Sequence, residues 1–97
     1  MSPTKLEYRV WQQADESYRD EILELKGRLS MADYRFRVNA EQGGIDPLSI
    51  TTHIEWTGEL ECRFTMEAPA PEEALSMAWE KSVSLIGLRT ELVTKAA

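Results

Sequence analysis

Polar and less polar residues alternate along three successive runs between residues 34 and 66. Successive side chains of a β-strand point to opposite faces, so this pattern is typical of strands with one buried and one solvated face. The sides that we expect to be buried are Tyr34, Phe36, Val38 and Ala40 in the first run, Leu48, Ile50, Thr52, Ile54 and Trp56 in the second, and Leu60, Cys62, Phe64 and Met66 in the third. The pattern predicts an antiparallel sheet of three strands.

Residues 4–29 carry a pattern that fits one long helix. Apolar residues recur there at intervals of three or four and would share one helix face: Leu6, Val10, Ala14, Tyr18, Ile22, Leu25 and Leu29. Gly27 suits the C-terminal end of this helix. Residues 5–11 also alternate, so they would equally make a short strand, with the helix beginning near Asp15. We favour the single helix, and the alternative stays open.

A second helix is predicted after the sheet. Pro71 and the two glutamates that follow it suit a first helical turn. Gly87 is expected to end or bend the helix. Residues 88–94 alternate as a fourth edge strand would, yet they would also continue the helix, and the pattern does not decide. The apolar stripe of the second helix is Leu75, Ala78, Trp79, Ser82 and Ile86.

The length of 97 residues predicts a single domain that covers residues 1–97. The expected fold class is α+β with two layers, in the order α-β-β-β-α, with both helices packed on the buried face of the sheet. A turn at residues 57–59 would set Trp56 opposite Leu60 and keep the buried faces together. The same register sets Glu55 opposite Glu61, which is an unfavourable contact between like charges.

Charge and hydropathy limit the classes of partner. The net charge is −6, from 17 acidic and 11 basic residues. Proteins that bind nucleic acid without sequence preference use clustered Lys and Arg to neutralise phosphates, so nucleic acid is an unfavourable partner here. No apolar run approaches the roughly 20 residues of a membrane span, and the N-terminus lacks the pattern of a secretory signal. We expect a cytoplasmic protein without a membrane segment.

The sequence shows no catalytic or cofactor-binding motif. His53 is the only histidine, which excludes a metal site built from several histidines. Cys62 is the only cysteine, and its place in the alternation predicts a small buried side chain rather than a reactive thiol. We therefore expect neither a cofactor nor a metal, and a protein that is not an enzyme.

By elimination, the sequence predicts a protein-binding module such as an adaptor, a chaperone-like factor or a small inhibitor. Tyr8, Trp11 and Leu23 lie off the main stripe of the predicted first helix and are the candidate partner-binding residues. Exposed aromatic anchors carry a large share of binding energy. We expect the partner to be another protein of unknown identity, and we expect a homodimer, since a symmetric dimer is the commonest way to cover an apolar surface.

An alternative hypothesis is a nucleic-acid or anion site on the open face of the sheet. In the predicted register Arg35 lies opposite His53, and His53 lies opposite Arg63, with Arg37 beside them. Phosphate binding through such a basic row would weaken steeply as salt rises, whereas an apolar interface would barely change.

Overall fold

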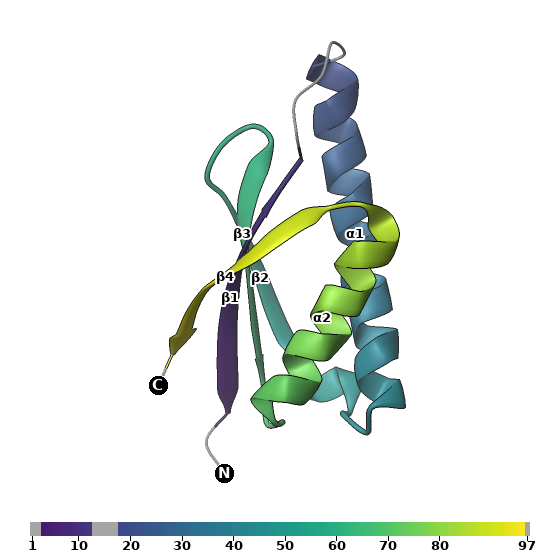
Figure 1. The fold of residues 1–97 in the computed structure, drawn as a ribbon, viewed down its shortest axis with the longest axis vertical. Coiled ribbons are helices and arrows are strands. Elements are labelled where there is room, and N and C mark those ends of the chain that lie inside the picture. Colours follow the sequence, from purple (N-terminus) through teal and green to yellow (C-terminus); the bar gives the residue numbers. More distant parts are fainter. Residues whose placement is uncertain (1–2, 13–17, 97) are drawn as a thin grey trace.

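The computed structural model describes residues 3–12 and 18–96, with side chains for residues 3–12 and 24–93. It is an α+β fold with a four-stranded antiparallel sheet and two α-helices (Figure 1). The elements are β1 (Thr4–Trp11), α1 (Tyr18–Gln42), the 3₁₀ helix η1 (Pro47–Ser49), β2 (Thr51–Trp56), β3 (Glu61–Ala68), α2 (Glu72–Ile86) and β4 (Arg89–Ala96).

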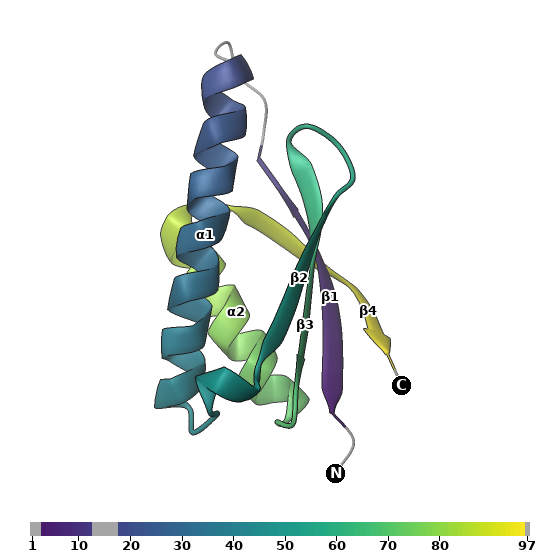
Figure 2. The same cartoon turned by 180° about the vertical axis from the view of Figure 1, so that it is seen from behind.

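The strands lie in the order β2-β3-β1-β4, and each neighbouring pair is antiparallel. Both helices cover the same face of the sheet and leave the other face open (Figures 1 and 2). This connectivity, with β1 and β2 separated by β3, is the ferredoxin-like β-α-β-β-α-β arrangement. The two-layer prediction is confirmed, whereas the sheet has four strands rather than three. Within the described residues, neither helix is both long and apolar enough to cross a bilayer.

The prediction of a helix over residues 4–29 is wrong at its N-terminal end, because Thr4–Trp11 is strand β1 in the middle of the sheet. Leu6, Tyr8 and Val10 are buried on the side of the helices. Leu6 and Val10 are four residues apart, so they fit a helix face and a strand face equally well. The alternative reading of a short strand before the helix is confirmed, although its start near Asp15 lies outside the described residues.

Residues 34–41 were predicted to be a strand and instead belong to the second half of α1. Phe36 and Ala40 are buried, as predicted, but Tyr34 and Val38 are exposed. The two pairs separate because a helix turns about 100° per residue and places residues two apart on nearly opposite sides. The buried stripe of the described part of α1 is Leu25, Leu29, Ala32, Phe36 and Ala40.

Gly27 does not end the first helix. It lies inside α1, where an added Cβ would meet nothing within 4 Å. The helix ends at Gln42, and Gly44 just after it has a φ of 88°, the left-handed conformation that glycine adopts readily. The Ile45 N–H then donates to the Ala40 carbonyl at 2.9 Å, which closes the last turn, and Ile45 is buried against the core.

The hairpin between β2 and β3 keeps the predicted faces with a different register. Trp56 lies opposite Cys62 rather than Leu60, because residues 57–60 connect the strands. A shift of two residues preserves the side to which each residue points. Glu55 consequently lies opposite Arg63, so the predicted contact between Glu55 and Glu61 does not form and the conflict of like charges disappears.

The boundaries predicted for the second helix are confirmed. Pro71 precedes the first turn of α2, and Gly87 ends the helix with a φ of 78°. Residues 88–94, for which two readings were open, lead into and form most of β4. β4 pairs with β1 with a break in register between Glu7 and Tyr8.

An aromatic cluster around Trp79 of α2 fills the space between the helices and the central strands. The Trp79 ring stacks on Phe64 with the ring centroids 4.3 Å apart. It makes an edge contact with Phe36, at a centroid distance of 5.9 Å, and a tilted contact with Tyr8 at 5.8 Å. Its Nε1 donates to Thr90 Oγ1 at 3.1 Å, so the indole is buried without an unpaired N–H. The core therefore lies over β1 and β3.

Candidate protein-binding surface

The structure does not bring the predicted partner-binding residues together. Tyr8 is only 1% exposed and lies on the side of the helices. Trp11 is partly buried on the opposite side of β1, where the Arg9 guanidinium carbon lies 4.2 Å from the centre of the indole ring. Leu23 belongs to α1, but its side chain is outside the described part of the chain. A partner cannot contact Tyr8 and Trp11 on one surface.

The basic residues of the alternative hypothesis do not form one row. Arg35 and Arg37 lie on α1, whereas His53 and Arg63 lie on β2 and β3. The Arg37 guanidinium bonds the Asp33 carboxylate at 3.2 Å and donates to Thr52 Oγ1 at 3.0 Å. It also donates to the backbone carbonyls of Pro47 and Ile50. Arg37 therefore holds η1 against α1 and does not face the open sheet.

The open face of the sheet carries acidic and basic side chains in alternation. Arg9 bonds Glu61 at 2.6 Å, and Arg63 bonds Glu7 at 2.8 Å. The hydrogen bond from Arg9 lowers the pKa of Glu61, and the bond to Glu61 raises the pKa of Arg9. Arg63 is flanked across the strands by Arg9 and Glu55. Mixed charges that pair with one another do not form a concentrated basic patch.

Two buried titratable groups lie on the helix side of the sheet. Burial, followed by the charges of Glu80 and Glu72, raises the pKa of the Tyr8 hydroxyl to about 12. Burial, followed by Glu61, raises the pKa of the Cys62 thiol to about 11. A thiol that stays protonated at neutral pH is a poor nucleophile. Among the residues that the structure describes, no group of three or more acidic, His or Cys side chains is placed to hold a metal ion.

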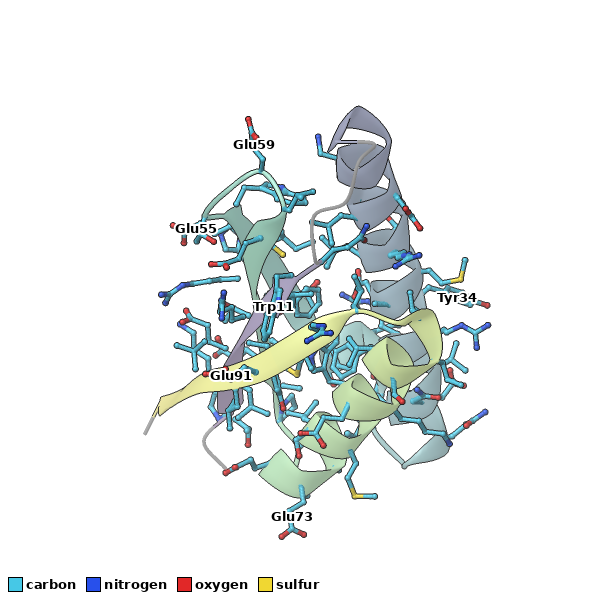
Figure 3. All side chains as sticks on the ribbon, turned by 45° about the horizontal axis from the view of Figure 1, so that its top comes forward. Trp11, Tyr34, Glu55, Glu59, Glu73 and Glu91 are labelled. Carbon is cyan, nitrogen blue, oxygen red and sulfur yellow. The ribbon has the colours of Figure 1, made fainter. Side chains whose placement is uncertain are left out.

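The outer side of the helix layer carries exposed apolar side chains from both helices. Tyr34 of α1 is 70% exposed and Met77 of α2 is 68% exposed. Figure 3 shows Tyr34 pointing away from the sheet, on the far side of α1. Met31 and Val38, three residues before and four residues after Tyr34, lie on the same face of α1 and are also exposed.

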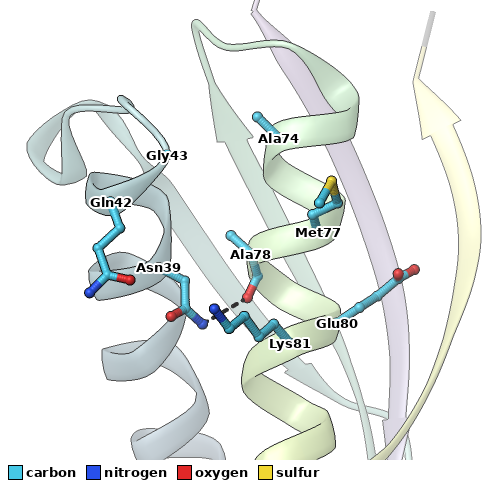
Figure 4. Close-up of a pocket in the computed structure, with 8 residues that line it drawn as sticks. All are labelled: Asn39, Gln42, Gly43, Ala74, Met77, Ala78, Glu80 and Lys81. Carbon is cyan, nitrogen blue, oxygen red and sulfur yellow. Dashed lines mark hydrogen bonds between the residues drawn. The ribbon is translucent and has the colours of Figure 1, made fainter.

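Two hollows lie on this outer side, one on α1 and one between α1 and α2, and we call the pair the helix groove. One hollow is lined by Met31, Tyr34, Arg35, Val38 and Asn39. A larger hollow of about 590 Å³ begins at Asn39, which the two hollows share, and is lined by Asn39, Gln42, Gly43, Ala74, Met77, Ala78, Glu80 and Lys81 (Figure 4).

Small residues keep the helix groove open where the helices cross. Ala74, Ala78 and Gly43 contribute no long side chain to it. Asn39 Nδ2 donates to the Ala78 carbonyl oxygen at 3.3 Å, which ties α1 to α2 at the middle of the groove (Figure 4). The groove thus combines a small-residue floor with methionine and aromatic walls.

Sequence reasoning missed these residues because it ended the first helix at Gly27. Continuing the three-and-four spacing from Leu25 through Ala40 would have placed Tyr34 and Val38 opposite the buried stripe. The fold and the groove define the chain as a small ferredoxin-like domain with an exposed apolar groove. No protein-family model matches the sequence, and no curated protein matches it either.

Proposed function

We propose that the protein is a non-enzymatic protein-binding module, of the adaptor, chaperone-like or small-inhibitor kind, and that its partner binds in the helix groove. The observation that carries this proposal is the presence of exposed apolar side chains in the lining of the groove, with Tyr34 and Met77 each at least 68% exposed. Contiguous exposed apolar patches of this kind mark interaction surfaces, whereas single exposed apolar residues do not.

The shape and chemistry of the groove favour the apolar side of a helix or an extended segment of another protein. Methionine is flexible and polarisable, so Met31 and Met77 can adapt to different apolar partners. The small residues Ala74, Ala78 and Gly43 in the lining of the groove leave room for inserted side chains. Its charged rim includes Glu80 and Lys81, which are of opposite sign, so the rim does not favour a polyanion.

The expectations that the partner is another protein and that the chain is not an enzyme enter this proposal unchanged. Partner identity is open, and the cytoplasmic location stays a prediction. A nucleic-acid partner receives no support from the structure, since Arg37 is bonded within the fold and Arg63 is paired with Glu7.

Capture from the native source tests this proposal. Wild type and the double variant Tyr34→Gln/Met77→Gln are immobilised, incubated with extract, and compared by quantitative mass spectrometry. Glutamine suits a helix, and both positions are exposed, so the free energy of unfolding of the double variant should match that of wild type within about 0.5 kcal/mol. We expect at least one protein to be retained by wild type and roughly tenfold less by the variant.

Val93→Thr is the matched control, because it removes exposed apolar surface from β4 instead of the groove. It should retain the same proteins as wild type. Identical retention by all three forms would contradict the proposal.

A further inference from the structure

Strand β2 has a backbone edge that no other described strand covers. β2 lies at one margin of the sheet and pairs only with β3. The Thr57 N–H donates to the Glu61 carbonyl at 3.2 Å in the same register as the strand pairs. Backbone bonding alternates along an antiparallel pair, so His53 and Glu55 direct their N–H and C=O groups to β3. The groups that point outward belong to Thr52, Ile54 and Trp56.

The two margins of the sheet differ in how they resist further pairing. β4 pairs with β1 through a break in register at Glu7 and Tyr8, and such irregularities twist an edge away from other strands. β2 pairs with β3 in one unbroken register from Thr51 to Trp56. It contains no Lys and no Pro, which are common blocking residues at sheet edges. β2 is therefore the edge that can accept another strand.

Apolar side chains lie exposed at this same edge. Ile54 is 37% exposed and Trp56 is 42% exposed, although both point to the side of the helices. The corresponding residues of the neighbouring strand, Phe64 and Cys62, are fully buried. The Lys26 ammonium lies 5.7 Å from the centre of a Trp56 ring and covers it only in part. A strand added at β2 would bury apolar surface and satisfy the free backbone groups together.

We propose that this added strand is β2 of a second copy of the chain. The two strands pair antiparallel about a twofold axis at Ile54, which joins two four-stranded sheets into one continuous sheet. Ile54 then faces Ile54 of the second copy, and Trp56 faces Thr52 of the second copy. The pairing is closed by symmetry, and the β4 edges, with their broken register, remain outside and do not extend it.

The side chains beside the axis favour this register. With Ile54 on the axis, His53 of each copy lies opposite Glu55 of the other, so an imidazole N–H can donate to the carboxylate. Moving the axis to Glu55 would set Glu55 against Glu55, and moving it to His53 would set His53 against His53. Only the register centred on Ile54 opposes a basic with an acidic side chain at both ends. The interface is small, so the dimer should form reversibly with concentration.

Sedimentation equilibrium over a concentration series tests the proposal on the full chain. Wild type should show a monomer–dimer equilibrium. Ile54→Lys places two ammonium groups across the axis and should weaken dimerisation by roughly tenfold or more. The matched control is Val93→Lys, which makes the same kind of change on β4, where Val93 is 41% exposed. It should leave the equilibrium unchanged.

A charge exchange tests the register. His53→Glu sets a carboxylate opposite Glu55 of the second copy and should weaken the dimer roughly tenfold, whereas the double variant His53→Glu/Glu55→Lys restores opposite charges and should recover the wild-type affinity within about threefold. A wild type that stays monomeric at all concentrations would overturn the proposal. So would equal weakening by Ile54→Lys and Val93→Lys, or a double variant as weak as the single one.

The dimer and the helix groove use different surfaces, so the two proposals fail separately. Tyr34→Gln/Met77→Gln should dimerise like wild type. Ile54→Lys should retain the same captured proteins as wild type.

Discussion

The central strands β1 and β3 and the edge strand β2 carry the same kind of alternating pattern, yet they bury it to different degrees. Val10 and Phe64 are fully buried on the side of the helices, whereas Ile54, which lies opposite Phe64 in the sheet, is more than a third exposed. A central residue has strands on both sides and a helix above it, while an edge residue lacks one neighbour. Alternation determines the side to which a residue points, and the place of its strand in the sheet determines how deeply it is buried.

The largest expected effect is the loss of stability when Phe64 of the central strand β3 is truncated, compared with the loss when Ile54 of the edge strand β2 is truncated. Phe64→Ala removes a ring that stacks on Trp79 and should lower the free energy of unfolding by about 3–5 kcal/mol. Ile54→Ala removes a partly exposed side chain and should cost only about 1 kcal/mol. Urea unfolding followed by circular dichroism, at a protein concentration low enough to exclude dimers, measures both. Equal losses would contradict the distinction between centre and edge.

A smaller effect is expected at Tyr8, which is the polar exception within the buried centre. Its hydroxyl is buried and has no hydrogen-bond partner among the described residues. Tyr8→Phe removes an unpaired polar group and should raise the free energy of unfolding by about 1 kcal/mol at neutral pH. Urea unfolding of the two proteins at pH 7 measures the difference.

The same residue predicts a change of stability at alkaline pH. Its pKa is raised from 10.0 to about 12 in the folded protein, so the unfolded chain loses this proton first. Stability contributed by the protonated form is complete below about pH 10 and falls as the pH rises toward 12. Tyr8→Phe should lose less stability than wild type over this interval. Parallel curves for the two proteins would contradict the assignment.

The smallest expected effects are changes of opposite sign at two glycines. Gly27 lies on an exposed face of α1, and Gly87 lies just before the edge strand β4. Gly27→Ala should raise the free energy of unfolding by about 0.5–1 kcal/mol, because the helix has open space there. Gly87→Ala should lower it by about 1 kcal/mol, because Gly87 has a φ of 78° that alanine adopts poorly. Thermal or urea unfolding compares them. Destabilisation by Gly27→Ala would indicate that the helix ends at Gly27 after all.

Part of the fold could be predicted from the sequence because local signals agree there. Pro71 and Gly87 delimit α2, and the alternation of Cys62, Phe64 and Met66 identifies the buried side of β3. These segments have only one periodicity that fits, so no tertiary information is needed to interpret them.

The first half of the chain could not be assigned from periodicity alone. Leu6 and Val10 fit two periods, and Tyr34 with Phe36 imitates a strand within a helix. Only the pairing of Tyr8 with Phe64 in the sheet decides between them, and that contact links residues distant in sequence. The candidate site was missed for the same reason, since the exposed face of α1 is defined only when the helix is known to continue past Gly27.

Amide hydrogen exchange by NMR on dilute protein tests the central claim most directly, because it reports the pairing of each strand residue by residue. The account predicts slow exchange at Tyr8 and Phe64, slow exchange through residues 34–41 as part of α1, and fast exchange at Ile54. Fast exchange at Tyr8, or exchange at Ile54 as slow as at Phe64 in the monomer, would contradict a sheet with β1 at its centre and β2 at its open edge.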